Sequence, residues 1–149
     1  MEDLSTQLKN LIANDKYEIT SLSNMSALIF NSLSNVSWAG FYLVKDNKLI
    51  LGPFQGKIAC TEIQFGKGVC GTTAVKKETI IVEDVHKFPG HIACDSESNS
   101  EIVVPIFKNG DLYGVLDLDS KMLGRFKEED KILLESLVKV LEQKLNDLI

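Results

Sequence analysis

The sequence predicts an α+β fold, in which helices at both ends of the chain flank a central, mostly antiparallel sheet of about six strands. Apolar residues recur at helical spacing near both termini, whereas the middle of the chain alternates short apolar runs with turn residues. Asn109-Gly110 between two such runs is typical of a tight hairpin. Because the 149 residues contain no repeat, linker or low-complexity segment, we expect one domain spanning residues 1–149.

The individual elements follow from these patterns. Amphipathic helices are expected at residues 3–13 and 18–33. A longer helix at 127–148 carries an apolar stripe of Ile132, Leu133, Leu137, Val140, Leu141, Leu145 and Leu148. Strands are expected at 36–44, 48–51 (ended by Gly52-Pro53), 59–63, 79–82, 102–107 and 111–119, and a short helix at 69–76. The segment 83–100 is then a loop of about 18 residues, a length typical of functional loops.

Composition and charge exclude several classes of function. The net charge of −5 gives no basic surface for nucleic acid or anionic membrane. Met1-Glu2-Asp3 is acidic where a signal peptide is basic, and no apolar run approaches the roughly 20 residues of a membrane-spanning helix. We therefore expect a cytoplasmic protein. The absence of a Cys-x-x-Cys pair and of a Cys/His cluster predicts no metal site.

Three cysteines suggest thiol chemistry. Cys94 lies in the polar loop 88–101, which also carries His91 and Glu101. Cys70 begins the predicted helix 69–76, where a helix N-terminus stabilises a thiolate, and Cys60 lies in a strand-like segment. A thiolate that attacks an electrophilic sulfur or oxygen becomes a mixed disulfide or a sulfenic acid, which a second cysteine resolves.

Two alternatives to this redox chemistry remain open. Cys94 is then a small buried hydrophobe, or a hydrolase nucleophile paired with His91, for which the sequence offers no identifiable Asn or Asp to orient the histidine.

Acidic residues form a second candidate cluster. Asp117 and Asp119 share one face of the strand 111–119, so each raises the other's affinity for a proton and makes a proton-donating carboxylic acid plausible. The alternative is that both are solvated at the strand end. With a strict two-residue hairpin loop, Ile102 lies opposite Asp117 and Glu101 points to the other face. Pro105 indicates an edge strand or a bulge that resets this register, so the side of Glu101 stays open.

Trp38 and Tyr42 share one face of the strand 36–44. Four residues apart, they are too distant for direct contact but able to wall one pocket for a methyl or cationic group. Core packing is the alternative, although a buried Trp38 N–H needs a hydrogen-bond partner.

Taken together, these residues resemble the free methionine-(R)-sulfoxide reductases, enzymes built from one GAF domain. The resemblance spans residues 38–130. It rests on WAGFY from Trp38, LGPFQG from Leu51, GKGVCGT from Gly66, VEDVH from Val82, the Cys94 loop, GVLDLDS from Gly114, and Arg125-Phe126.

The resemblance implies reduction of the R epimer of free methionine sulfoxide, not of the oxidised residue within proteins. It implies Cys94 as nucleophile, Cys60 as resolving cysteine and Cys70 as an auxiliary one. Proton donation and substrate binding fall to Glu101, Asp117 and Asp119, and the wall against the sulfoxide methyl to Trp38 and Tyr42. The amino-acid end is enclosed by the loop 83–94, with Glu83, Asp84, Ile92 and Ala93 as candidate contacts.

The same resemblance implies that thioredoxin recycles the disulfide, that no organic or metal cofactor is needed, and that the protein is a homodimer. The main rival is a GAF module that binds a small molecule or signals without turnover. The three cysteines have no use in such a module.

Overall fold

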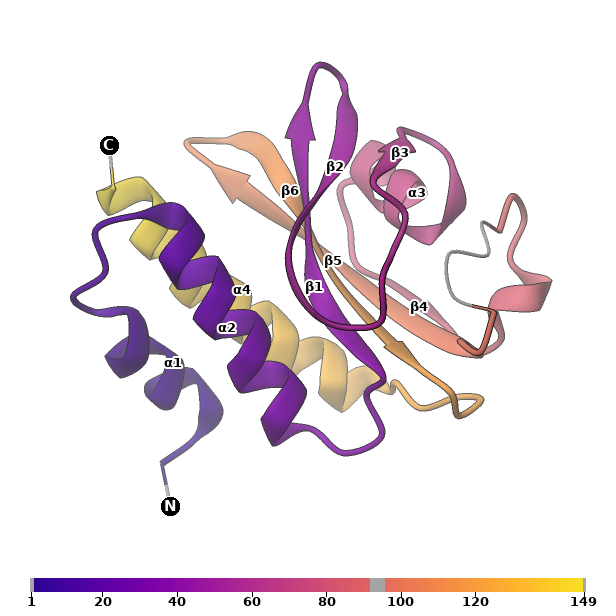
Figure 1. Ribbon diagram of the computed structural model, residues 1–149, viewed down its shortest axis with the longest axis horizontal. Helices are drawn as coiled ribbons and strands as arrows, with labels where there is room; N and C mark the ends of the chain where they lie inside the picture. Colours follow the sequence, from indigo (N-terminus) through magenta and orange to yellow (C-terminus); the bar gives the residue numbers. More distant parts are fainter. Residues whose placement is uncertain (1, 92–95, 149) are drawn as a thin grey trace.

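The computed structural model describes residues 2–91 and 96–148, and six strands in them form one antiparallel sheet of order β3-β2-β1-β6-β5-β4 (Figure 1). The elements are α1 (Leu4–Ile12), α2 (Glu18–Ser32), β1 (Trp38–Lys45), β2 (Lys48–Gly56), β3 (Glu62–Gln64), α3 (Gly68–Lys76), β4 (Ile80–Val82), a 3₁₀ turn (Val85–Lys87), β5 (Ser100–Lys108), β6 (Asp111–Ser120) and α4 (Glu128–Asp147). The predicted α+β class is confirmed. None of the described helices is long and apolar enough to span a membrane.

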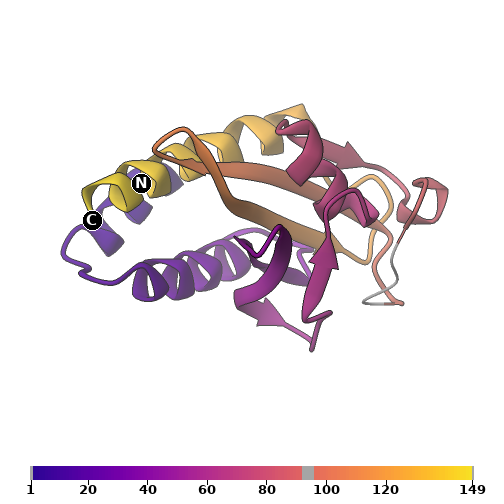
Figure 2. The same cartoon turned by 90° about the horizontal axis from the view of Figure 1, so that it is seen from above.

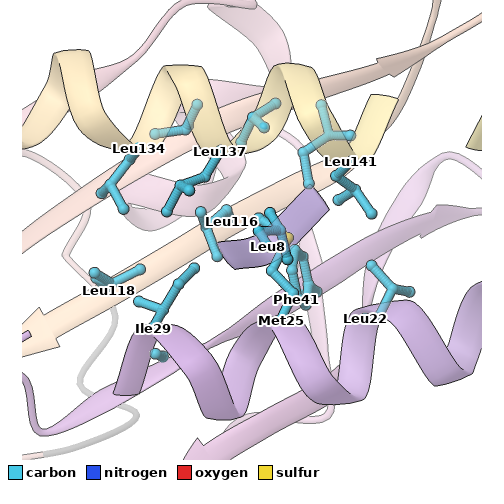
Figure 3. Close-up of a cluster of buried hydrophobic side chains, with 14 of the residues drawn as sticks. Leu8, Leu22, Met25, Ile29, Phe41, Leu116, Leu118, Leu134, Leu137 and Leu141 are labelled. Carbon is cyan, nitrogen blue, oxygen red and sulfur yellow. The ribbon is translucent and has the colours of Figure 1, made fainter. Parts of the chain in front are cut away.

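Helices α1, α2 and α4 gather on one face of the sheet, and α3 lies on the other (Figures 1 and 2). Side chains along β1 alternate between the two, because strand periodicity is two: Phe41 enters the helix-side core with Leu116 (Figure 3), and Tyr42 enters the smaller core beneath α3. The central strands are therefore covered on both faces, which makes β1 and β6 a rigid floor for any site beneath α3.

Helix α4 buries a stripe that differs in phase from the predicted one. The buried residues are Leu134, Leu137, Val138, Leu141 and Leu145, at the i, i+3, i+4, i+7 spacing of a single face. Ile132 is 62% exposed, so its place in the predicted stripe was wrong. This apolar stripe packs on the chain's own sheet and on α1.

Strand β2 continues beyond its predicted end to Gly56. Gly40 pairs with Phe54 and Tyr42 with Leu51, so β2 accommodates Gly52-Pro53 as a bulge of one extra residue. The neighbouring strand β3 pairs only with Lys48–Ile50 of β2. Pro53 lies beyond this pairing, so its missing N–H removes no hydrogen bond between β2 and β3. The strand predicted at 59–63 was also misplaced: β3 begins at Glu62, and Cys60 precedes it in a loop.

The β5–β6 hairpin turns at Asn109-Gly110, as predicted, with φ of 52° and 84°. Lys108 pairs with Asp111 and Phe107 with Leu112, but Ile106 pairs with Gly114, so Tyr113 is an extra residue in β6. From that bulge onward the register is shifted by one position. The strict register was therefore wrong, and the bulge alternative is confirmed.

Candidate active site

A cavity of about 50 Å³ lies between the sheet and α3. Six of the predicted site residues line it, namely Trp38, Tyr42, Cys70, Glu101, Asp117 and Asp119. They come from β1, α3, β5 and β6, elements far apart in the sequence. The first turn of α3 and His91 also contribute to the lining.

The β1 aromatic residues form one stacked wall. The ring centroids of Trp38 and Tyr42 lie 5.9 Å apart with an interplanar angle of 21°, so the expectation that they are too distant for contact was wrong. Gly40 between them explains the contact, because a Cβ there would meet the Trp38 ring at 2.9 Å and collide with Phe54. Phe54 also stacks on Trp38, with ring centroids 5.1 Å apart.

Both aromatic side chains also fasten the segment that precedes β3. Trp38 Nε1 donates a hydrogen bond to the carbonyl oxygen of Lys57 at 3.0 Å, which supplies the partner that a buried indole needs. The Tyr42 hydroxyl donates to the carbonyl oxygen of Cys60 at 2.9 Å. The wall of the cavity thus fixes the backbone on which Cys60 is carried.

The three carboxyl groups share one face of the sheet. Glu101 pairs directly with Asp119, and Asp119 pairs on its other side with Trp38. Asp117 lies two residues along β6, opposite Gly40, so period-two alternation turns it to the same side. The structure therefore resolves the question left open for Glu101 and brings all three carboxyls to the cavity.

Burial raises the pKa values of two of these carboxyl groups. Asp117 is only 5% exposed, and its Oδ1 has no hydrogen-bond partner among the described residues. Burial, followed by the neighbouring charge of Asp119, raises the pKa of Asp117 well above its usual value. Burial and then the charge of Asp117 raise the pKa of Glu101 in the same way. Both shifts favour the protonated form, which is the form that can donate a proton.

Cys70 does not behave as its helix position suggested. Its side chain is buried in the first turn of α3, and Sγ donates to Glu101 Oε2 at 3.9 Å. Burial, then the charges of Asp117 and Glu101, raises the pKa of the Cys70 thiol, whereas the helix N-terminus was expected to lower it. The anionic neighbours and the lack of solvent outweigh the helix dipole here.

The cysteines also differ in bonding. Cys70 is a free thiol, and Cys60 is disulfide-bonded. Sγ of Cys70 and carboxylate oxygens of Glu101 and Asp117 lie within 4.8 Å of one another, close enough to ligate one metal ion, a grouping that the sequence did not predict. Cys94, Ile92 and Ala93 lie outside the described residues.

Glu83 and Asp84 lie outside the cavity lining. Glu83 is exposed, and its carbonyl oxygen accepts from Gly124 N at 2.9 Å. Asp84 caps the 3₁₀ turn, where Oδ1 accepts from His86 N and lies 3.0 Å from His86 Nδ1. His91, which the sequence named only as a partner for Cys94, does line the cavity. Burial lowers its pKa, with a smaller effect from His86.

Gly68 and Ser98 were missed by the sequence reasoning, although both line the cavity. Gly68 has φ of 61° and its N–H donates to the carbonyl oxygen of Gly90, so it ties the start of α3 to the loop after the 3₁₀ turn. The Gly66-Lys67-Gly68 run was the signal available for it. No comparable signal marked Ser98, because nothing in its sequence neighbourhood distinguishes it from a solvated loop residue.

Comparison with known proteins agrees with this geometry. A family model described as GAF domain matches residues 18–145. The chain is 49% identical over 141 residues to "Free methionine-R-sulfoxide reductase" of Escherichia coli (strain K12), which covers 95% of this chain and 86% of that protein.

Two solved structures show similar backbones. The structure of "fRMsr of Staphylococcus aureus (reduced form)" has a TM-score of 0.93 and 52% identity, and covers 95% of this chain and 92% of the other. The free methionine-R-sulfoxide reductase of Neisseria meningitidis in complex with its substrate has a TM-score of 0.94 and 42% identity, with 97% and 87% covered. The chain therefore belongs to the GAF domain family, within the group of free methionine-R-sulfoxide reductases.

Proposed function

We propose that this chain reduces free methionine-(R)-sulfoxide to methionine by thiol chemistry. The observation that carries the proposal is the row of carboxyl groups formed by Glu101, Asp117 and Asp119 beneath α3, beside an aromatic wall. Relatives of about half identical sequence carry the name of this activity. A binding module has no need for a buried carboxylic acid and a disulfide-forming cysteine in one place.

Proton delivery is the task of the carboxyl cluster. A sulfoxide oxygen leaves sulfur readily only when it is protonated as the S–O bond breaks, so a positioned acid accelerates the step. Asp117 and Glu101 suit this role, because burial raises their pKa values and so favours the protonated form. An ionised member of the cluster pairs with the substrate ammonium.

The aromatic wall orients the other end of the substrate. Trp38 and Tyr42 present a flat apolar surface on the same face as the carboxyls. A methyl group on a positively polarised sulfur packs well against such a surface. Only one epimer of the sulfoxide can direct its oxygen to the acids while its methyl contacts the rings, and the name of the relatives supports the R epimer.

Cys94 is the proposed nucleophile, and Cys60 resolves it. The Cys94 thiolate attacks the sulfoxide sulfur, the acid protonates the oxygen, and methionine leaves with Cys94 oxidised to the sulfenic acid. The Cys60 thiol then displaces the hydroxyl group as water and forms the disulfide. The chain has three cysteines, of which Cys70 is free and Cys60 is disulfide-bonded, and this supports Cys94 as the partner of Cys60.

Recycling, location and assembly complete the proposal. A dithiol protein of the thioredoxin class reduces the Cys60–Cys94 disulfide, and the site needs no organic or metal cofactor. A cytoplasmic location fits a cycle that depends on such a reductant. A homodimer remains a prediction, to which α4 lends no support, since its apolar stripe is already buried within the chain.

A single-turnover experiment tests this function. Reduced protein mixed with free methionine-(R)-sulfoxide is expected to release one methionine per chain and to lose two of its three thiols. The S epimer serves as the matched control and is expected to release none. Binding of the substrate with no loss of thiols would replace the reductase with the GAF binding module.

A further inference from the structure

We propose that Cys70, Glu101 and Asp117 form an inhibitory binding site for zinc inside the cavity, where a bound ion competes with the sulfoxide substrate. The Sγ atom of Cys70 and one carboxylate oxygen from each of the two acids lie within 4.8 Å of one another. The competition rests on the proposed function, whereas the binding rests only on the geometry of these three side chains.

The spacing of these atoms suits a tetrahedral zinc ion. Zinc holds a thiolate sulfur at about 2.3 Å and a carboxylate oxygen at about 2.1 Å, which places two such ligand atoms roughly 3.6 Å apart. Sγ of Cys70 and Oε2 of Glu101 lie 3.9 Å apart, so a small rotation of either side chain brings them to that distance. Because one ligand is sulfur, the site favours zinc over magnesium and calcium, which prefer oxygen ligands.

Asp117 points to a bound cation independently of this spacing. Its side chain is 5% exposed and lines the cavity, yet Oδ1 has no hydrogen-bond partner among the described residues. A buried acceptor without a partner costs free energy, and a bound ion is one group that satisfies it. A zinc ion does so, and under the proposed function the substrate ammonium does so as well. The two occupants therefore compete for the same carboxyl group.

The sheet and α3 set the positions of the ligands and leave room for the ion. Glu101 and Asp117 are placed by the β5–β6 ladder, in which Glu101 pairs with Asp119 and Val103 with Asp117. Cys70 lies in the first turn of α3. The cavity volume of about 50 Å³ is several times the roughly 10–15 Å³ that one water molecule needs. Three protein ligands and one water molecule can then complete a four-coordinate site.

Zinc binding at this site changes no oxidation state. A Zn–S bond forms as the S–H bond of Cys70 breaks and its proton passes to solvent, and a protonated carboxyl ligand gives up its proton in the same way. The dication then offsets the repulsion between the neighbouring anions, which burial otherwise strengthens. The bound ion thus removes the protons that reduction of the sulfoxide requires, so zinc blocks turnover instead of assisting it.

Zinc binding to the oxidised full-length protein tests the site without any turnover. In this state Cys60 is disulfide-bonded and Cys70 keeps a free thiol. After treatment with a chelator, equilibrium dialysis is expected to give one zinc ion per chain. Cd²⁺, used as a probe, is expected to give the ultraviolet charge-transfer band of a cadmium–thiolate bond. C70S is expected to lose this band. Both C70S and D117N are expected to bind zinc at least roughly tenfold more weakly, since even the loss of a hydrogen-bond partner of a zinc ligand typically costs that much.

D119N is the matched control. Asp119 lies on the same face of the sheet as Asp117 but outside the group of three ligands, so D119N removes one carboxyl group and is expected to keep the zinc affinity of the parent. Equal weakening in D119N and D117N would attribute zinc binding to the general negative charge of the cavity and would overturn the site. Parent affinity in C70S and D117N would overturn it as well.

Inhibition is measured separately, in single turnovers of the reduced protein. Zinc is expected to slow methionine release by the parent, and excess free methionine-(R)-sulfoxide is expected to restore the rate. Relative to its own zinc-free rate, C70S is expected to need at least roughly tenfold more zinc for the same slowing. A rate that excess sulfoxide does not restore, or equal inhibition of C70S and the parent, would overturn the competition. Failure of the proposed function looks different, because the parent then releases no methionine without zinc, while dialysis still reports zinc binding.

Discussion

Glu101 of β5 lies directly opposite Asp119 of β6, and this pairing depends on one extra residue, Tyr113, in the hairpin. Without the bulge, the strict register puts Ile102 opposite Asp117 and turns Glu101 to the helix-side core, where a carboxyl group has no solvent and no cation. The inserted residue is held in place as well, because the Tyr113 hydroxyl donates to Glu18 Oε1 at 2.9 Å. A local irregularity of the hairpin thus completes the carboxyl cluster.

Asp117 should reveal its burial through the pH dependence of stability. Its folded-state pKa is raised, so between the unfolded and the folded pKa the native state binds more protons, and stability falls as pH rises through that window. D117N removes this penalty while keeping the shape. Between pH 5 and pH 8, the Tm of the parent should therefore fall more than the Tm of D117N, by a few degrees (about 2–4 °C per kcal/mol). D117N should also lose most of its turnover.

The control for this effect is Glu97, which is exposed and has a lowered pKa. Its contribution to stability is present at neutral pH and is lost only as pH falls toward about 2, so E97Q should follow the parent between pH 5 and pH 8. Identical melting curves for D117N and the parent at every pH would show that Asp117 is not desolvated in solution.

Much of the fold is predictable from the sequence because it depends on local patterns. Helical periodicity identified α1, α2 and α4, and Asn109-Gly110 identified the hairpin. The bulges at Gly52-Pro53 and Tyr113 were not located, since a bulge changes the register of two strands without leaving a distinctive local composition. Six of the predicted residues line the cavity, but the face on which Glu101 lies was not predicted.

The stacking of Trp38 on Tyr42 and the raised pKa of Cys70 were missed for a related reason. The raised pKa of Cys70 depends on contacts between α3 and the sheet, and the stacking depends on the space above Gly40 within β1, neither of which residue spacing reports. The lack of a side chain at Gly40 leaves the space in which the Trp38 ring stacks on Tyr42. The pKa of the Cys70 thiol was predicted from its place in the helix alone, although the carboxyl groups that raise it come from β5 and β6.

Gly40→Ala should disturb the aromatic wall. The new methyl would lie 2.9 Å from the Trp38 ring and 2.3 Å from the Phe54 Cβ, so the ring and the β2 backbone must both shift. We expect a loss of about 1–3 kcal/mol in the free energy of unfolding, together with a higher KM. Gly52→Ala is the matched control. A methyl group at Gly52 would meet its nearest atom, the Phe41 carbonyl oxygen, at 3.2 Å, so it is less crowded than one at Gly40, and Gly52 does not line the cavity. A larger effect of Gly52→Ala on KM would argue against the wall as a substrate contact.

Serine substitution of each cysteine should give three different results. Cys94→Ser is expected to release no methionine, since a hydroxyl is a weak nucleophile at neutral pH. Cys60→Ser is expected to release one methionine per chain but not to recycle with thioredoxin. Cys70→Ser is expected to retain both steps, because burial and the neighbouring carboxyls keep this thiol protonated.

Thiol counting and peptide mapping after one turnover check these outcomes. The parent and Cys70→Ser should both yield a Cys60–Cys94 bridge. A lasting Cys70–Cys94 bridge would mean that the roles of the two partner cysteines are exchanged. Multiple turnovers by Cys60→Ser at the parent rate would show that the reductant attacks the sulfenic acid directly.

Selectivity for the free amino acid should follow from the charge of the cavity. The ammonium group of free methionine sulfoxide loses its hydration on entry, a cost that is recovered only if a partner of opposite charge is present. Asp119, Asp117 and Glu101 on one face provide such partners, and burial makes each unpaired carboxylate costly. An N-acetylated substrate adds bulk and does not supply the ammonium group that these carboxyl groups would bind.

We therefore expect N-acetyl-methionine-(R)-sulfoxide to be reduced with a kcat/KM lower by up to roughly 10⁴-fold, the range reached when a site built for a polar group meets a substrate lacking it. Steady-state rates with the free and the acetylated substrates measure this ratio. Repeating the comparison in Asp119→Asn separates charge from size. Asp119→Asn removes one charged partner of the ammonium, so the ratio of kcat/KM between the free and the acetylated substrate should become smaller. If discrimination depended on size alone, this ratio would not change. Equal rates on both substrates in the parent protein would show that the cavity admits peptide-like groups and that its carboxyls serve proton transfer alone.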